Sequence, residues 1–299
     1  LRPTLRSPLR PSLQRSPLDA LRELQEVYRD FLTIVTADLP LLSALFFVID
    51  PTDADRVASS VMSMFWFLEK ELSLFEWAIR MEVEATASPT VLFRSNSMAI
   101  RLVSMYAKTS ATPYLKVLLL PLIEDAVSGD PTRFEVDANR CPGMNAATLK
   151  RNQKNLEDIV TRFLEAIVNS VQRVPRVLRR ICMLFVDLVG RKFPNDSHKA
   201  VGAFLFLRFI CPAIVAPSSF GLLQKHPTGA AHRALVLVAK VLQNVANFTQ
   251  FKEPEMEGLN PFVEAKQGLV QQFLTAVSIT DEKVEGEPLA VLRPTVVAD

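Results

Sequence analysis

Apolar residues recur at intervals of three and four along most of the chain, which is the pattern of helices with one buried face. Four such stripes run over residues 21–35, 57–72, 156–171 and 177–188. Alternating apolar and polar residues, bounded by the Asn-Gly or Asp-Gly turns typical of hairpins, do not occur. The pattern therefore predicts an all-α fold whose striped helices face a common core.

The two ends of the chain differ from this pattern. Residues 1–17 are rich in Pro, Ser and Arg and cannot present a continuous apolar face, so we expect a disordered linker. Ser16 and Pro17 then form a helix-start signal, with the hydroxyl at the N-cap and proline at the first helical position. We expect one helical domain over residues 18–279 and an acidic, proline-containing tail over 280–299.

Composition narrows the class of protein further. The 299 residues include only 9 glycines and 3 cysteines, and the cysteines lack the spacing of a zinc ribbon or a disulfide framework, which favours an intracellular protein. Apolar runs such as 41–49 are too short to span a bilayer, which favours a soluble chain. The net charge of +2, with a near-neutral body, argues against nucleic acid as the main partner.

Two later segments carry unusual polar residues. Residues 203–216 are apolar on all sides except for Arg208, which predicts a buried helix that ends or bends at Pro212, with an arginine that must find acceptors. Residues 234–248 predict a helix with a separate polar stripe. Lys240, Gln243 and Asn247 belong to that stripe.

Enzyme motifs for nucleotide binding, acyl transfer or zinc hydrolysis are missing from the sequence, and the three histidines lack ligand spacing, so we expect neither a complete active site nor a metal site. Arg94 is a candidate functional residue because of its place in the sequence. It follows a Ser/Thr/Pro-rich loop and precedes a helical stripe, so it could project from a supported loop, although spacing alone favours an ordinary surface arginine.

Three segments, in this order, resemble the signature elements of Ras GTPase-activating proteins. Residues 90–99, TVLFRSNSMA, resemble the finger loop of that family; residues 206–214, FLRFICPAI, resemble its FLR…PA signature; residues 239–247, AKVLQNVAN, resemble its polar helix facing Ras. The segments between them most resemble neurofibromin-type members, namely 134–137, 152–153, 191–194 and 200–202. Cys211 departs from that type, which often has Asn there.

The resemblance implies a helical fold with a central catalytic module and a smaller flanking helical part formed by the two ends of the domain. It implies that Arg94 is an arginine finger inserted into the nucleotide site of GTP-loaded Ras, and that Arg208 stabilises the finger loop by donating to its backbone. It further implies roles for six other residues: partner contacts for Phe93, Leu207, Gln243 and Asn247, and an internal pair of Lys240 with Glu253.

The same resemblance implies that the chain has no cofactor of its own, since GTP and Mg²⁺ would be bound to Ras. We expect a cytoplasmic domain that Ras recruits to the inner face of membranes. Two alternatives stay open. One is a degenerate family member that binds GTPases without stimulating hydrolysis; the other is a helical adaptor for a helix or a membrane, using the basic cluster Arg173, Arg176, Arg179 and Arg180.

Overall fold

The structure, a computed structural model, describes residues 17–279 apart from 38, 90, 94–95 and 142. Helices and short loops account for this part of the chain, and it contains no strand, so the predicted all-α fold is confirmed. Of the predicted linker over residues 1–17, the structure describes Pro17, which is the first residue of α1 rather than part of a linker. Residues 1–16, the predicted tail over 280–299 and Arg94 lie outside the described residues.

The helices pack around one continuous core, which runs from Leu42 near the N-terminus to Val277 near the C-terminus. The central member is α5 (Met98–Val127), which contacts α3, α4, α6, α7 and α10. The other α-helices are α1 (Pro17–Ala37), α2 (Leu39–Val48), α3 (Ala54–Phe67), α4 (Glu71–Ala85), α6 (Ala146–Val168), α7 (Arg176–Lys192), α8 (Ser197–Gly202), α9 (Cys211–Val215), α10 (Gly229–Asn247) and α11 (Asn260–Val277). Shorter turns are η1 (Pro131–Phe134), η2 (Val171–Arg173), η4 (Pro217–Phe220) and η5 (Glu257–Leu259), and η3 (Ala203–Ile210) is a π-helix.

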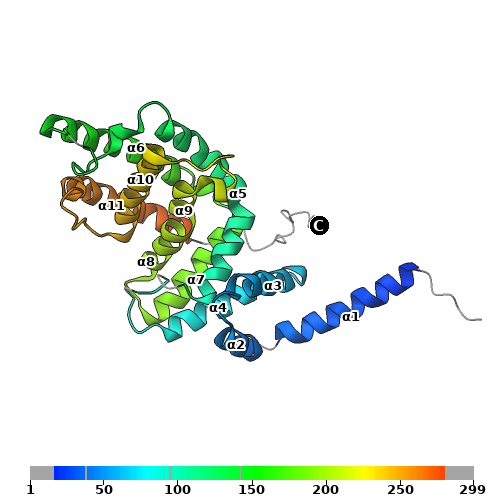
Figure 1. The fold of residues 1–299 in the computed structure, drawn as a ribbon. Coiled ribbons are helices and arrows are strands. Elements are labelled where there is room, and N and C mark those ends of the chain that lie inside the picture. The colour runs from blue at the N-terminus through cyan, green and yellow to red at the C-terminus, as the bar shows by residue number, and fades with distance from the viewer. Residues whose placement is uncertain (1–16, 38, 90, 94–95, 142, 280–299) are drawn as a thin grey trace, which may run out of the picture.

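The N-terminal helix α1 differs from its sequence prediction. Its stripe forms a helix as expected, but Tyr28 and Phe31 are 56% and 58% exposed rather than buried. The reason is that α1 packs only lightly on α2 and α3, and Figure 1 shows it projecting away from the other helices. The expected core-facing orientation is therefore wrong for Tyr28 and Phe31, whereas the stripes of α6 and α7 are largely buried.

The described ends of the domain do not form one flanking part together. The C-terminal helix α11 packs on α6, α8 and α10 through its buried residues, which include Phe273 and Leu274. Figure 1 shows α1 and α11 on opposite sides of the molecule. Within residues 17–279, α11 thus belongs to the main core, because its apolar face is already covered there.

The stripe over residues 57–72 is divided between two helices. Helix α3 ends at Phe67, and Glu69 takes a left-handed φ of 57°. Backbone hydrogen bonds from Glu69 to Trp66 (3.0 Å) and from Lys70 to Phe65 (2.8 Å) close a Schellman motif, which ends a helix. Glycine usually occupies this position, so the sequence carried no signal for the break.

One helical stretch, Ser197–Val215, is long and apolar enough to cross a membrane by length and hydropathy alone. Arg208 interrupts the apolar run of this stretch, so the length of the helix was not apparent from the sequence. Of its most apolar window, 67% is buried inside the protein. We therefore interpret it as a central helix of the core.

Candidate functional site

The loop between α4 and α5 is the candidate site, and its first residues are fixed from α7. Lys192 Nζ donates to the carbonyl oxygens of Val83, Glu84 and Thr86, each at 2.9 Å. These are among the last carbonyls of α4 and the first of the loop, where the regular hydrogen bonds of a helix run out. The Val83 carbonyl oxygen also accepts from the Thr86 N–H at 3.3 Å. The single ammonium group thus anchors the start of the loop to α7.

Phe93 anchors the middle of the loop in the core. Its side chain is 0% exposed, and its ring packs edge-on against Phe185 with the centroids 4.5 Å apart. The backbone there is left-handed, with φ of 58°, which costs a non-glycine residue about 1–3 kcal/mol unless the surroundings enforce it. The expectation that the Phe93 side chain contacts a partner is wrong for this structure, because the ring is enclosed by the protein itself.

Arg208 reaches the same loop from η3, on both sides of residues 94–95. Its Nε donates to the Phe93 carbonyl oxygen at 3.2 Å, and its Nη1 donates to Asn96 Oδ1 at 3.1 Å. The sequence predicted a largely buried Arg208, but the side chain is half-buried. Its two acceptors lie at the edge of the core, so the aliphatic part is covered while the guanidinium reaches toward the surface.

The helix that presents Arg208 has an unusual winding. Residues Ala203–Ile210 form a π-helix, and α-helical winding resumes at Cys211, with Pro212 in the first turn of α9. Proline has no backbone N–H, so it cannot donate into the preceding turn. The predicted bend at Pro212 thus takes the form of a change of helix type, and π-helical turns are frequent at functional sites.

A surface groove of about 500 Å³ adjoins the Arg208 side chain. Leu207 and Arg208 line it together with Asn96, Ile100, Arg101 and Lys108 from the loop and from α5. Lys108 Nζ lies 4.9 Å from the ring centroid of Phe220, which also lines the groove. Leu207 is therefore placed next to Arg208 at an accessible surface.

Helix α10 carries the remaining predicted residues. Gln243 and Asn247 are both half-buried and lie one helical turn apart, while Leu242 and Val245 are buried. Lys240 Nζ lies 3.1 Å from Glu253 Oε1, so the structure brings this predicted pair together. The two side chains are 40% and 46% exposed, which makes it a surface ion pair.

Reversing the charge of Lys240 tests how much this pair matters. Lys240→Glu places two carboxylates together and is expected to lower the free energy of unfolding, and adding Glu253→Lys is expected to restore most of the loss. Because the pair is exposed, the coupling energy should be at most about 1 kcal/mol. Urea unfolding of the two single variants and the double variant measures it; strictly additive losses would show that the pair contributes nothing.

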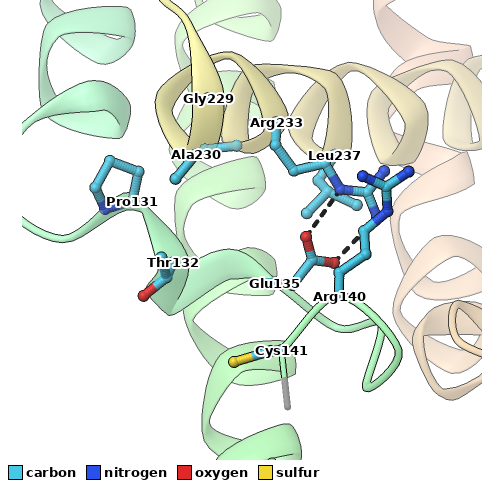
Figure 2. A pocket seen from close by; sticks show the side chains of 10 residues that line it. Pro131, Thr132, Glu135, Arg140, Cys141, Gly229, Ala230, Arg233 and Leu237 are labelled. Carbon is cyan, nitrogen blue, oxygen red and sulfur yellow. Dashed lines mark hydrogen bonds and ion pairs between the residues drawn. The ribbon is translucent and has the colours of Figure 1, made fainter.

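A more deeply buried ion pair joins Glu135, the residue after η1, to Arg233 on α10, and it was not found from the sequence. Glu135 is 8% exposed; its Oε2 accepts from Arg233 Nε at 2.9 Å and its Oε1 from Nη2 at 3.0 Å. Figure 2 shows the two side chains meeting beside a cavity of about 330 Å³. The residues are 98 positions apart, so no local pattern indicates that they pair.

The protonation of Glu135 is coupled to folding. Burial disfavours its charged form, but hydrogen bonds from Arg233 and from the backbone N–H groups of Asp137 and Val136 outweigh that effect and lower its pKa from the ordinary 4.5. A carboxylate with a lower pKa in the folded state stabilises the fold above its unfolded-state pKa. This stabilisation is lost as the pH falls through the folded-state pKa.

We expect Glu135→Gln to lower the free energy of unfolding by about 3 kcal/mol at pH 7, because Arg233 loses its buried countercharge. The difference from the unchanged protein should shrink below about pH 4.5, where Glu135 begins to lose its charge in the unfolded chain and then in the folded one. Urea unfolding from pH 7 to pH 3.5 measures both quantities. A gap that stays constant over this range would contradict the assignment.

The structure also bears on two other expectations from the sequence, the basic cluster and the metal site. Within the basic cluster of the adaptor hypothesis, Arg179 is 8% exposed and donates to the Val171 carbonyl, so it supports the fold rather than a surface. In the described part of the chain, His, Cys, Asp and Glu form no group of three or more that could hold a metal ion. Whether GTP and Mg²⁺ arrive with a partner stays a prediction.

Comparison with known proteins identifies a family match and several relatives of this chain. Residues 140–247 match the family described as GTPase-activator protein for Ras-like GTPase. Over 236 residues and 75% of this chain, 34% of positions are identical in a Dictyostelium discoideum protein named probable Ras GTPase-activating-like protein ngap. The human Ras GTPase-activating protein nGAP is 31% identical over 86% of the chain, and human Disabled homolog 2-interacting protein is 32% identical over 85%.

The chain spans about a quarter of the length of these relatives, at 26%, 23% and 21%. The matched family region includes Leu207, Arg208, Lys240, Gln243 and Asn247, whereas Arg94 precedes it. A particular likeness to neurofibromin is not shown, and the relatives point to the nGAP type instead. The comparisons thus show that this chain contains a RasGAP domain, with relatives named as Ras GTPase-activating proteins.

Proposed function

We propose that the chain is a GTPase-activating domain that binds a Ras-family GTPase in its GTP-bound state and accelerates GTP hydrolysis. In this proposal Arg94 is the arginine finger, Arg208 holds the loop that carries it, and the GTPase supplies the nucleotide and Mg²⁺. The chain would then act in the cytoplasm and at the inner face of membranes that carry Ras, where it would switch off Ras signalling.

The chemistry explains why an arginine is needed. As the phosphoryl group moves from GTP to water, negative charge develops on its oxygens and on the bridging oxygen, and a positioned cation lowers the energy of that state. A guanidinium stays protonated and donates several hydrogen bonds in one plane, which an ammonium group cannot do. Arginine fingers of Ras activators contribute about 10³–10⁵ in turnover, a value that belongs to that general system and not to this chain.

The observation that carries the proposal is the hold of Arg208 on the loop. Its hydrogen bonds to Phe93 O and Asn96 Oδ1 fix the two residues that flank positions 94–95. A catalytic group works best when its supporting residues limit its movement to a fraction of an ångström. The groove beside Arg208, with Leu207 at its edge, and the polar face of α10 with Gln243 and Asn247 offer an accessible surface for the GTPase.

Phosphate release from GTP-loaded Ras, with and without the chain, tests the proposal. An activator accelerates release and is needed only in catalytic amounts. A degenerate domain would bind GTP-loaded Ras without accelerating release, and an adaptor for another partner would do neither. The affinity for GTP-loaded Ras, measured by fluorescence in parallel, separates these last two outcomes.

A further inference from the structure

Asn96 is held by a second guanidinium, from a helix different from the one that carries Arg208. Arg101, in the first turns of α5, donates from Nε to the backbone carbonyl oxygen of Asn96 at 3.2 Å. Arg208 donates from Nη1 to the side-chain oxygen of the same asparagine. The residue that follows positions 94–95 is thus fixed through its backbone by α5 and through its side chain by η3.

Arg101 is itself oriented by a carboxylate on α3. Its Nη1 forms a hydrogen-bonded ion pair with Asp55 Oδ1, 46 positions earlier in the chain. An arginine has five donors in a rigid plane, so fixing one edge of the guanidinium fixes the direction of the Nε–H as well. A continuous connection therefore runs from α3 through Asp55 and Arg101 to the backbone of the loop.

We propose that Arg101, oriented by Asp55, is a positioning residue that fixes the C-terminal side of the finger loop. The inference rests on the proposed function, because it assumes that residue 94 acts in a GTPase active site. It assigns Arg101 a task separate from that of Arg208: Arg208 connects the two sides of positions 94–95, whereas Arg101 ties the outgoing backbone to the helix that begins at Met98.

The exposure of the pair separates positioning from a general contribution to stability. The Asp55 side chain is 75% exposed and that of Arg101 is 26% exposed. Exposed ion pairs contribute little to the free energy of unfolding, so loss of this one should leave the melting temperature nearly unchanged. A displacement of about 1 Å of a catalytic group can nevertheless cost up to 10²-fold in rate.

Both residues also line the groove beside Arg208, so a direct contact with the GTPase is the competing explanation. The two explanations differ in what they change. A positioning residue alters the maximal rate of hydrolysis at saturating chain and leaves the half-saturating concentration alone. A contact residue raises the half-saturating concentration and leaves the maximal rate alone.

Single-turnover phosphate release from GTP-loaded Ras, over a range of chain concentrations, tests the proposal in Arg101→Gln, Asp55→Asn and the double variant. We expect the maximal rate to fall roughly 10-fold in Arg101→Gln and roughly 3-fold in Asp55→Asn, with half-saturation unchanged. The double variant should equal Arg101→Gln alone, since Asp55 acts through Arg101. Arg56→Gln is the matched control, because Arg56 lies on α3 next to Asp55 but pairs with the N-cap residue Asp53, and it should keep the full rate.

The same variants placed in an Arg94→Ala background distinguish failure of this inference from failure of the proposed function. If Arg101 acts through the finger loop, Arg101→Gln has no further effect once Arg94 is removed. The inference alone would be overturned if the unchanged chain accelerates hydrolysis and this acceleration is lost in Arg94→Ala but retained in Arg101→Gln. It would also be overturned if Arg101→Gln changed only the half-saturating concentration. No acceleration by the unchanged chain would overturn the proposed function, and the inference with it.

Discussion

Arg94→Ala is expected to lower the stimulated rate of GTP hydrolysis by roughly 10²-fold or more, while the affinity for GTP-loaded Ras falls only modestly. The reason is that an arginine finger interacts with negative charge that develops in the transition state. This charge is smaller in the ground state, so the finger contributes less to binding. Arg94→Lys should be almost as slow, because an ammonium group restores the charge but not the planar donors. Single-turnover phosphate release at saturating chain, with affinity measured by fluorescence, gives both values.

Arg80→Ala serves as the control for this variant, because Arg80 is an exposed residue of α4 that pairs with Glu76 on its own helix. It should keep the full rate. A near-normal rate in Arg94→Ala would refute the finger assignment. A loss of affinity in proportion to the loss of rate would instead make Arg94 a residue that binds the ground state and the transition state equally.

Arg208→Ala is expected to produce two separate losses. The rate should fall by roughly 10-fold or more, because the carbonyl of Phe93 and the side chain of Asn96 lose their common donor and the loop gains freedom. The free energy of unfolding should also fall, by about 1–3 kcal/mol, since hydrogen bonds to a half-buried charged group are lost. Phosphate release and urea unfolding measure the two effects.

The two losses are separable by Arg208→Lys. Lysine keeps the charge and much of the aliphatic packing, but one ammonium group cannot reproduce the fork that reaches both acceptors. We therefore expect stability to recover more than the rate. Full recovery of the rate in Arg208→Lys would show that the charge alone suffices, and it would contradict the positioning role.

The sequence was sufficient for the helices whose apolar stripes meet a core. The stripes of α6 and α7 are largely buried, since period and burial agree there. The stripe over 156–171 was expected on one helix, but α6 ends at Val168 and the half-buried Val171 lies in η2. The start of α5 could have been predicted from Ser97, whose hydroxyl caps the helix by accepting from the Ile100 N–H at 3.3 Å. Helix α1 forms while Tyr28 and Phe31 of its stripe stay exposed, because periodicity indicates a helix but not what covers it.

The site was predictable only in part, because its supports come from distant parts of the chain. The bonds from Arg208 to the loop join residues 115 and 112 positions apart, and the bonds from Lys192 span 106 to 109. Arg208 was found because an arginine in an apolar helix needs acceptors. Lys192, next to Arg191, and Arg101, between Ile100 and Leu102, each fit the pattern of a solvent-facing residue on an amphipathic helix, so neither gave such a signal. The left-handed backbone at Phe93 is likewise set by tertiary packing rather than by residue type.

Multiple-turnover hydrolysis decides whether the chain activates GTP hydrolysis on Ras. GTP-loaded Ras in large excess is mixed with the unchanged chain, and phosphate release is followed beside a reaction with Ras alone and one with the Arg94→Ala variant. We expect each chain molecule to convert many GTP-loaded Ras molecules, and the Arg94→Ala variant to do so at least roughly 10²-fold more slowly. Phosphate release no faster than that of Ras alone, at a Ras concentration that saturates the chain, would contradict the proposed function.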